Sequence, residues 1–226
     1  MNPKQIAAER AVSYVQDAMT VGLGTGSTAA FAVPALAARV QAEGLSLRCL
    51  ATSAATEELA RAHGLVLTDW GSISVLDITI DGADEADPEL RLIKGGGGAL
   101  VREKIVAAST TTEIIVVDEH KIKEALGAFP LPVAVLPFGW ESTQAQLSDY
   151  FHCPVTLRHA PDGSVFVSDD HLYILDMAFG APLPEQNTLE AEIKRIVGVV
   201  EVGLFVGLCQ RLIIGYADGH TEERTP

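Results

Sequence analysis

The sequence has few positive charges for its length. Its 226 residues include 16 Lys and Arg against 30 Asp and Glu, which gives a formal net charge of −14. Because nucleic-acid affinity is built mostly from clustered Lys and Arg, this balance argues against a nucleic-acid partner. An anionic ligand would have to be met by a few local positive groups.

Cysteines and metal-ligand patterns are also scarce. The three cysteines, Cys49, Cys153 and Cys209, form no CxxC pair, which is typical of a reducing compartment where thiols stay unbridged. None of the six histidines stands in HExxH or another ligand spacing. We therefore expect no metal.

The sequence also lacks an uninterrupted apolar stretch long enough to cross a membrane. The uncharged segment 18–38 is broken by glycines, hydroxyl residues and Pro34. The first residues alternate charged and apolar positions, as an amphipathic helix does and a signal peptide does not. We expect a cytoplasmic protein with no membrane partner.

Segments of strand and helix character alternate along the first half of the chain. Apolar runs predict strands at 20–23, 47–51, 75–80 and 113–117, with helical patterns at 6–15, 55–63 and 99–108 and a helix capped by Ser27. Such alternation predicts a parallel sheet covered by helices. Functional loops should then follow the carboxyl ends of the strands.

The pattern changes after the proline-rich segment 129–132. Short strands near 155, 165 and 173 and helical segments near 141 and 190 predict an inserted α+β lobe. We expect the strands at 199–205 and 212–216 to return the chain to the main sheet. The polar tail after Asp218 is expected to be mobile.

A glycine-rich turn, Gly22-Leu23-Gly24-Thr25-Gly26-Ser27-Thr28, lies between the first strand and the next helix. Backbone N–H groups and the helix dipole attract phosphate at such a place. Two other interpretations stay open, a dinucleotide site and a tight turn without a ligand. The dinucleotide pattern is weakened because its third glycine is Ser27 and the next strand ends without a ribose-binding carboxylate.

Carboxylates crowd the end of the strand at 75–80, at Asp81, Asp84, Glu85 and Asp87. Crowded like charges raise some carboxyl pKa values, which suits acid and base chemistry. A solvated loop and a divalent-metal cluster are the alternatives. Lys94 follows directly before four glycines, so its ammonium could meet these carboxylates and a bound oxyanion.

Glu103 has apolar neighbours on its helical face, because Ala99, Leu100, Val106 and Ala107 stand three or four residues away. A carboxyl group desolvated there would have a raised pKa, as a general base requires. The alternative is that Arg102, Glu103 and Lys104 are a solvated strip of the helix.

Several of these motifs occur together in one known family. GLGTGST, TSAAT, DGADE, KGGGGAL followed by REKIVA, DEHK, FPLPV and GVVEVGLF stand in the order and approximate spacing of A-type ribose-5-phosphate isomerases. The sequence resembles that family over nearly its whole length, and the segment from Asp81 to Ile105 is the most specific part.

The resemblance implies a fold and an assembly. It implies an α/β fold, a Rossmann-like parallel-sheet domain (1–127 plus 203–226) with an inserted ferredoxin-like α+β lobe (128–202). It further implies a homodimer or homotetramer that needs no cofactor, binds a small sugar phosphate and serves the non-oxidative branch of the pentose phosphate pathway.

The resemblance also implies roles for individual residues. Glu103 would move a proton between C2 and C1 of the opened sugar, Asp81 would assist ring opening, and Asp84 and Lys94 would hold and polarise the sugar oxygens. The phosphate would lie on Thr25 to Thr28. The implied substrate contacts are Thr25, Gly26, Ser27, Thr28, Asp81, Gly82, Ala83, Asp84, Lys94, Gly95, Gly96, Gly97, Lys121 and Lys4.

The sequence departs from the family pattern at His120, in the turn Ser168 to Leu172 and at Val197, and none of these positions is in the acid and base set. Two other kinds of protein share a related fold, a non-catalytic sugar-phosphate-sensing domain and a CoA transferase. A sensor need not assemble Asp81, Lys94 and Glu103, and a CoA transferase is usually larger.

Overall fold

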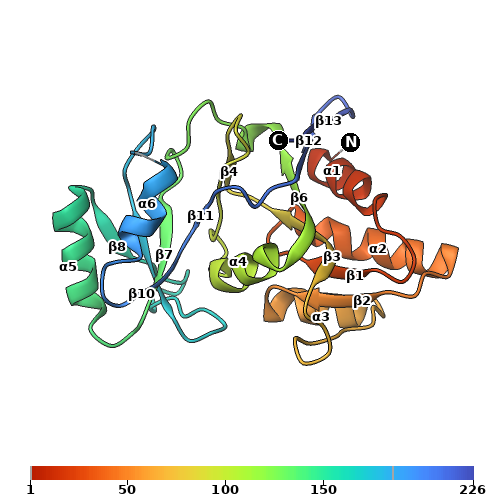
Figure 1. Ribbon diagram of the computed structural model, residues 1–226, viewed down its shortest axis with the longest axis horizontal. Helices are drawn as coiled ribbons and strands as arrows, with labels where there is room; N and C mark the ends of the chain where they lie inside the picture. Colours follow the sequence, from red (N-terminus) through yellow and green to blue (C-terminus); the bar gives the residue numbers. More distant parts are fainter. Residues whose placement is uncertain (1, 185) are drawn as a thin grey trace. The chain divides into compact units, whose positions relative to one another are not determined.

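The computed structural model describes residues 2–184 and 186–226, and Figure 1 shows its elements. The helices are α1 (Pro3–Val12), α2 (Ala29–Glu43), α3 (Ala54–Ala62), α4 (Leu100–Ala108), η1 (Glu119–Lys121, a 3-10 turn), α5 (Trp140–Phe151) and α6 (Gln186–Ile193). The strands are β1 (Thr20–Leu23), β2 (Arg48–Ala51), β3 (Leu76–Gly82), β4 (Glu85–Ala86), β5 (Leu92–Ile93), β6 (Thr110–Asp118), β7 (Leu131–Val135), β8 (Val155–Leu157), β9 (Tyr173–Met177), β10 (Val199–Val202), β11 (Leu204–Phe205), β12 (Arg211–Gly215) and β13 (Thr221–Arg224).

The chain forms two compact units. The first unit comprises Met1–Ala83, Arg102–Ile122 and Gly207–Pro226, and the second comprises Asp84–Val101 and Lys123–Val206. A compact unit is not the same as an independently folding domain, so the domain boundaries expected from the sequence stay a prediction.

The main sheet of the first unit has the strand order β13-β12-β6-β3-β1-β2. The pairs from β12 to β2 are parallel, which confirms the parallel sheet predicted from the alternation. The end of the chain was predicted wrongly, because β13 pairs antiparallel with β12 as an edge strand. A short polar segment can still form an edge strand when one side of it faces solvent.

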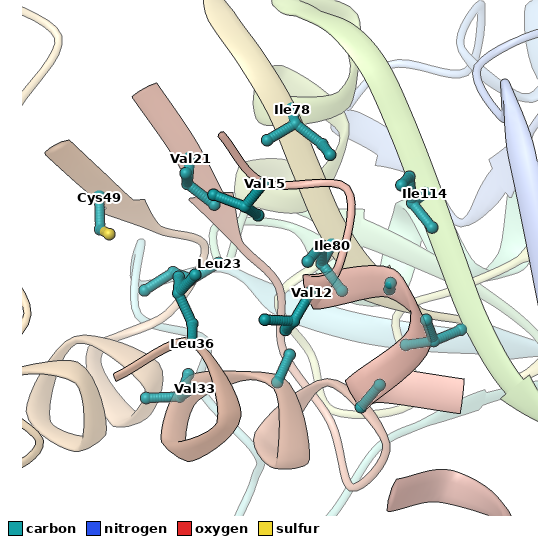
Figure 2. Packing of buried hydrophobic residues seen from close by; sticks show 14 of the residues in the cluster. Val12, Val15, Val21, Leu23, Val33, Leu36, Cys49, Ile78, Ile80 and Ile114 are labelled. Atoms are coloured by element: carbon teal, nitrogen blue, oxygen red, sulfur yellow. The ribbon is translucent and has the colours of Figure 1, made fainter. Parts of the chain in front are cut away.

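Apolar side chains of α1, α2 and the central strands pack into one core, part of which Figure 2 shows. Val12 comes from α1, Leu36 from α2, and Leu23 and Ile80 from neighbouring strands. Each is at most 1% exposed, so the burial of each side chain stabilises the folded state by about 1.5–3 kcal/mol. This core fixes the strand ends that carry the loops described below.

The second unit contains an antiparallel sheet of order β10-β7-β9-β8. Its elements follow one another as β7, α5, β8, β9, α6 and β10, which is the β-α-β-β-α-β succession of a ferredoxin-like fold. The predicted α/β architecture with an inserted ferredoxin-like lobe is therefore confirmed. Val165 lies in no named strand and makes only an isolated bridge to His159.

The apolar segment 199–205 does not return to the main sheet as expected. It splits at Gly203 into β10, which pairs with β7, and β11, which pairs with β5. The backbone of Gly203 forms hydrogen bonds to two other segments. Its N donates to Pro132 O of β7 (2.7 Å), and its O accepts from Lys94 N, directly after β5 (2.8 Å). The pattern of apolar residues in a segment can identify a strand, but it does not show which sheet that strand joins.

Among the residues that the structure describes, no helix combines the length and the apolar character needed to span a membrane.

Candidate active site

The glycine-rich turn lies at a switch point of the main sheet. β1 stands between β2 and β3, so the chain leaves β1 in one direction and later returns to its other side. In open α/β sheets, ligands bind outside the carboxyl ends of the strands at such a point. The turn 24–28 follows the carboxyl end of β1, and Asp81 lies near the carboxyl end of β3.

Asp81 is bonded to this turn and is buried, with 1% of its surface exposed. Its Oδ1 accepts from Thr25 N (2.9 Å) and from Gly82 N (2.7 Å). A Cβ on Gly24 would lie 2.1 Å from Asp81 Oδ1 and 2.4 Å from Asp81 Cα. Glycine is required there because the backbone of β3 occupies the space, so Asp81 and the turn form one rigid group.

Hydroxyl groups after β2 support the same turn, although they were not among the residues predicted to form the site. Thr25 Oγ1 bonds Thr52 Oγ1 (2.7 Å) and Ser53 Oγ (2.9 Å). Thr56 Oγ1 donates to Gly24 O (2.9 Å), which holds the turn from a second side. The hydroxyl-rich segment TSAAT at the end of the second strand was the available signal for these contacts.

Lys4 reaches the turn from the start of α1. Asn2 caps this helix by accepting from Lys4 N (3.1 Å), and Pro3 occupies its first position, where no N–H is needed. Lys4 Nζ donates to Ser27 Oγ (2.8 Å). Pro3 lies directly on β12, because a Cβ on Gly215 would come within 2.0 Å of Pro3 O.

Ser27 therefore accepts from Lys4 and is not the N-cap of α2. The cap position of α2 is Thr28, whose side chain makes no capping bond, and the helix begins one residue later. The predicted cap at Ser27 is wrong by one position. Thr28 is buried, whereas Gly26 and Ser27 are exposed.

Lys121 belongs to η1, directly after the carboxyl end of β6. Asp118 begins this turn by accepting from His120 N (3.0 Å), and Lys121 is half-buried. β6 pairs with β3 in parallel, with Val116 opposite Gly82. Lys121 thus follows the same edge of the sheet as Asp81, Gly82 and Ala83.

Glu103 lies on the buried face of α4 and is 5% exposed. Val106 and Ala107, one turn further along, are 2% and 4% exposed, while Ile105 on the other face is 51% exposed. The solvated-strip alternative is therefore wrong for Glu103. The carboxyl group is held away from bulk water, as the spacing of its apolar neighbours predicted.

In the second unit, Lys94 is almost completely buried, at 1% exposed. Its Nζ lies 5.5 Å from the centre of the Phe205 ring, a cation–π distance. Its backbone N donates to Gly203 O (2.8 Å), and a Cβ on Gly203 would lie 2.3 Å from Lys94 O. An ammonium is buried at high cost, so a lysine kept in such a place usually has a function.

Asp84 and the glycines after Lys94 are brought together. Asp84 is half-buried, its N donates to Ile93 O (2.8 Å), and its Oδ2 accepts from Gly96 N (2.7 Å). A Cβ on Gly96 would lie 2.5 Å from Asp84 Oδ1. Gly95 has φ +98°, a left-handed conformation that favours glycine. Gly97 lies in the same turn and is exposed.

Of the four crowded carboxylates, Asp81 and Asp84 contact the glycine-rich turns, whereas Glu85 and Asp87 have structural partners. Glu85 is buried and accepts from Gly127 N and Phe129 N (2.8 Å each), and Asp87 forms an ion pair with Arg91. These two hold the backbone of the second unit. In the described part of the chain, no group of three or more His, Cys, Asp and Glu side chains is arranged to hold a metal ion.

These features first define a class: an α/β protein with a Rossmann-like sheet and a ferredoxin-like lobe, which has glycine-rich turns and buries two carboxyl groups and an ammonium group, those of Asp81, Glu103 and Lys94. The model of the ribose 5-phosphate isomerase A (phosphoriboisomerase A) family matches residues 48–219. The chain belongs to this family, and it is an isomerase of this type.

Relatives and solved structures agree with this assignment. The ribose-5-phosphate isomerase A of Bacillus thuringiensis is 48% identical, covering 98% of this chain and all of that protein. That of Ruegeria sp. is 45% identical, covering 98% and 86%. The structure of ribose 5-phosphate isomerase from Plasmodium falciparum is 38% identical with a TM-score of 0.95, covering 99% and 97%.

A further D-ribose-5-phosphate isomerase structure was solved in complex with phospho-erythronic acid. It is 32% identical with a TM-score of 0.95, and the match covers all of both chains. The dinucleotide-binding, CoA transferase and non-catalytic sensing alternatives are not favoured by these relatives.

Proposed function

We propose that this chain interconverts D-ribose 5-phosphate and D-ribulose 5-phosphate by moving one proton through an enediol or enediolate. The observation that carries the proposal is the burial of Glu103 in a chain that belongs to this family. A carboxylate removed from bulk water is a stronger base than an exposed one, and proton abstraction beside a carbonyl needs such a base.

The acid and base roles follow from the chemistry of the opened sugar. Glu103 removes the proton from C2 and returns it to C1 of the enediol. Asp81, held by two backbone N–H groups, assists ring opening and moves protons among the hydroxyl groups. Asp84 and Lys94 hold and polarise the sugar oxygens, since an ammonium stabilises the negative oxygen of an enediolate.

The phosphate is anchored by the turn 25–28 and by nearby lysines. Backbone N–H groups at the start of α2 and the hydroxyls of Thr25, Ser27 and Thr28 are donors suited to phosphate oxygens. Lys4, which already contacts Ser27, adds a positive charge, and Lys121 adds another. Gly82, Ala83 and Gly95 to Gly97 contact the sugar.

The wider setting is proposed as well. The reaction needs no cofactor, because only a proton moves. The chain acts in the cytoplasm, in the non-oxidative branch of the pentose phosphate pathway, as a homodimer or homotetramer. Light scattering of the purified protein distinguishes these assemblies from a monomer.

The test follows ribose 5-phosphate conversion by the purified, chelator-treated chain, its Glu103→Gln variant and a control, Glu57→Gln. Glu57 is 46% exposed on α3 and pairs with Arg61, so it should not affect the reaction. We expect Glu103→Gln to lower kcat by roughly a hundredfold to ten-thousandfold with an unchanged circular dichroism spectrum.

A second measurement separates proton transfer from other routes. In D2O, a base that exchanges its proton with solvent introduces deuterium at C1 of the product, which NMR detects. A folded but inactive parent chain would contradict the proposed function. An active Glu103→Gln variant with normal kcat would remove Glu103 from the mechanism while leaving the function standing.

A further inference from the structure

Arg158 contacts the glycine turn that follows Lys94, although the two are far apart in the sequence. It stands directly after β8, and its Nη1 donates to Gly95 O (2.8 Å) and Gly96 O (3.0 Å). The side chain is 13% exposed, so water competes little for these bonds. A run of glycines restricts its own backbone weakly, and one cation on two successive carbonyls supplies the missing restraint.

Two further residues of the lobe hold the guanidinium in place. Asp176 of β9 accepts from Arg158 Nε (2.9 Å) and pairs with Nη2, which makes a bidentate ion pair. The Phe166 ring centre lies 5.9 Å from Arg158 Cζ. The same ring would be 2.3 Å from a Cβ on Gly98, so it also touches the turn.

The contact with the carbonyls determines where the N–H groups of the turn point. In a trans peptide, the N–H points away from the preceding carbonyl. With Gly95 O on Arg158, the N–H of Gly96 points the other way, and there it meets Asp84 Oδ2 at 2.7 Å. By the same geometry, the bond from Arg158 to Gly96 O directs the N–H of Gly97 away from the guanidinium.

We propose that Arg158 is a positioning residue for the isomerisation, which sets the N–H groups of Gly96 and Gly97 and, through Gly96, the carboxylate of Asp84. The inference rests on the proposed function, in which Asp84 and this turn contact the sugar. A cation on the carbonyls also polarises the two peptides and strengthens their N–H groups as donors. The polarised N–H of Gly96 holds Asp84 more firmly, and that of Gly97 counts most when negative charge develops on a sugar oxygen, so kcat changes more than KM.

The kinetic test compares the parent with Arg158→Met, Arg158→Lys and a control, Arg195→Met, on the exposed surface of the same lobe. We expect Arg158→Met to lower kcat roughly tenfold to a hundredfold with a smaller change in KM. Arg158→Lys keeps the charge but loses the planar guanidinium that bonds Asp176 and the glycine carbonyls together. Its kcat should therefore lie between those of Arg158→Met and the parent. Added guanidinium, at a concentration that leaves the fold intact, should raise the kcat of Arg158→Met and leave that of the parent unchanged.

A spectroscopic readout tests the positioning without turnover. In ¹H–¹⁵N NMR spectra, the amide resonances of Gly96 and Gly97 should shift in Arg158→Lys and stay in place in Arg195→Met. A folded Arg158→Met or Arg158→Lys with the parent's kcat and unmoved glycine amides would overturn the inference. If Arg158→Met does not fold, Arg158→Lys decides by the same two readouts. A parent that is itself inactive would contradict the proposed function instead, so the two failures are distinguishable.

Discussion

The two glycine-rich turns of this protein are held in place by different chemistry. In the turn 24–28 of the first unit, the carbonyl of Gly24 accepts from a neutral hydroxyl, that of Thr56. Charged groups contact this turn at other atoms, because Asp81 accepts from Thr25 N and Lys4 donates to Ser27 Oγ. The turn 95–98 in the second unit is held by charged groups, Arg158 and Asp84. A neutral hydroxyl polarises the peptide whose carbonyl it binds less than a cation does. A turn braced by a cation has polarised N–H groups, which suits an oxygen that becomes negative during the reaction.

The largest expected effect comes from adding one methyl group to each turn. Gly24 and Gly96 both lack a left-handed φ, so alanine is acceptable to the backbone at each and only its surroundings differ. Gly24→Ala places Cβ against the backbone of Asp81, which cannot yield, and we expect a loss of about 1–3 kcal/mol or more of stability. The thermal unfolding temperature and kcat should both be lower than in the parent.

Gly96→Ala should act on activity rather than on stability. Its Cβ meets the end of the Asp84 side chain, which can rotate away, but the bond from Gly96 N to Asp84 is then lost. A hydrogen bond to a charged group contributes about 1.5–3 kcal/mol, so kcat/KM should fall roughly tenfold to a hundredfold. Equal losses of stability in the two alanine variants would show that the turns are braced alike.

A smaller effect is expected from removing one neutral brace. Thr52→Val keeps the shape of the side chain but removes a hydroxyl that bonds Thr25 Oγ1 (2.7 Å) and Leu23 O (3.2 Å). We expect a stability loss of about 0.5–1.5 kcal/mol and a raised KM with little change in kcat. Thr111→Val, on the exposed start of β6, is the control. A change in kcat as large as that of Arg158→Met would remove the distinction between the two turns.

The smallest effect concerns two buried thiols that precede Thr52 and Arg158 in the sequence. Cys49 lies in β2, just before Thr52, and Cys153 lies just before β8, which leads to Arg158. Burial raises the pKa of both thiols, that of Cys49 to about 12. Buried neutral thiols react only when their segment opens. We expect Cys153, at 7% exposed, to be alkylated before Cys49, at 0%, as mass spectrometry of peptides would show.

The Cys49 thiol also gives a pH dependence with a defined sign. Its pKa rises from an ordinary value of 9.0 in the unfolded chain to about 12 in the folded chain. The stability linked to this proton is therefore fully present below pH 9 and is lost as the pH rises towards 12. Cys49→Ala should lose less stability than the parent between pH 9 and 12. In the labelling experiment, alkylation of Cys49 before Cys153 would contradict the expected order.

Local patterns predicted what depends on near neighbours in the sequence. The turn after the first strand and the buried face of Glu103 both follow from residues within four or five positions, and both are present. Arg158 and the hydroxyls after β2 could not be found in this way, because the turn residues that they contact are 27 to 63 residues away. The destination of the segment 199–205 depends on pairing between distant strands, which an apolar period does not specify.

The strand order also determines when the main sheet can be completed during synthesis. β12 lies between β6 and β13, and it leaves the ribosome only after the whole ferredoxin-like lobe has been made. Until then, one side of β6 remains an open edge in the growing chain. A nascent chain paused after residue 206 would thus have its lobe elements complete while β6 still exposes backbone groups to other chains.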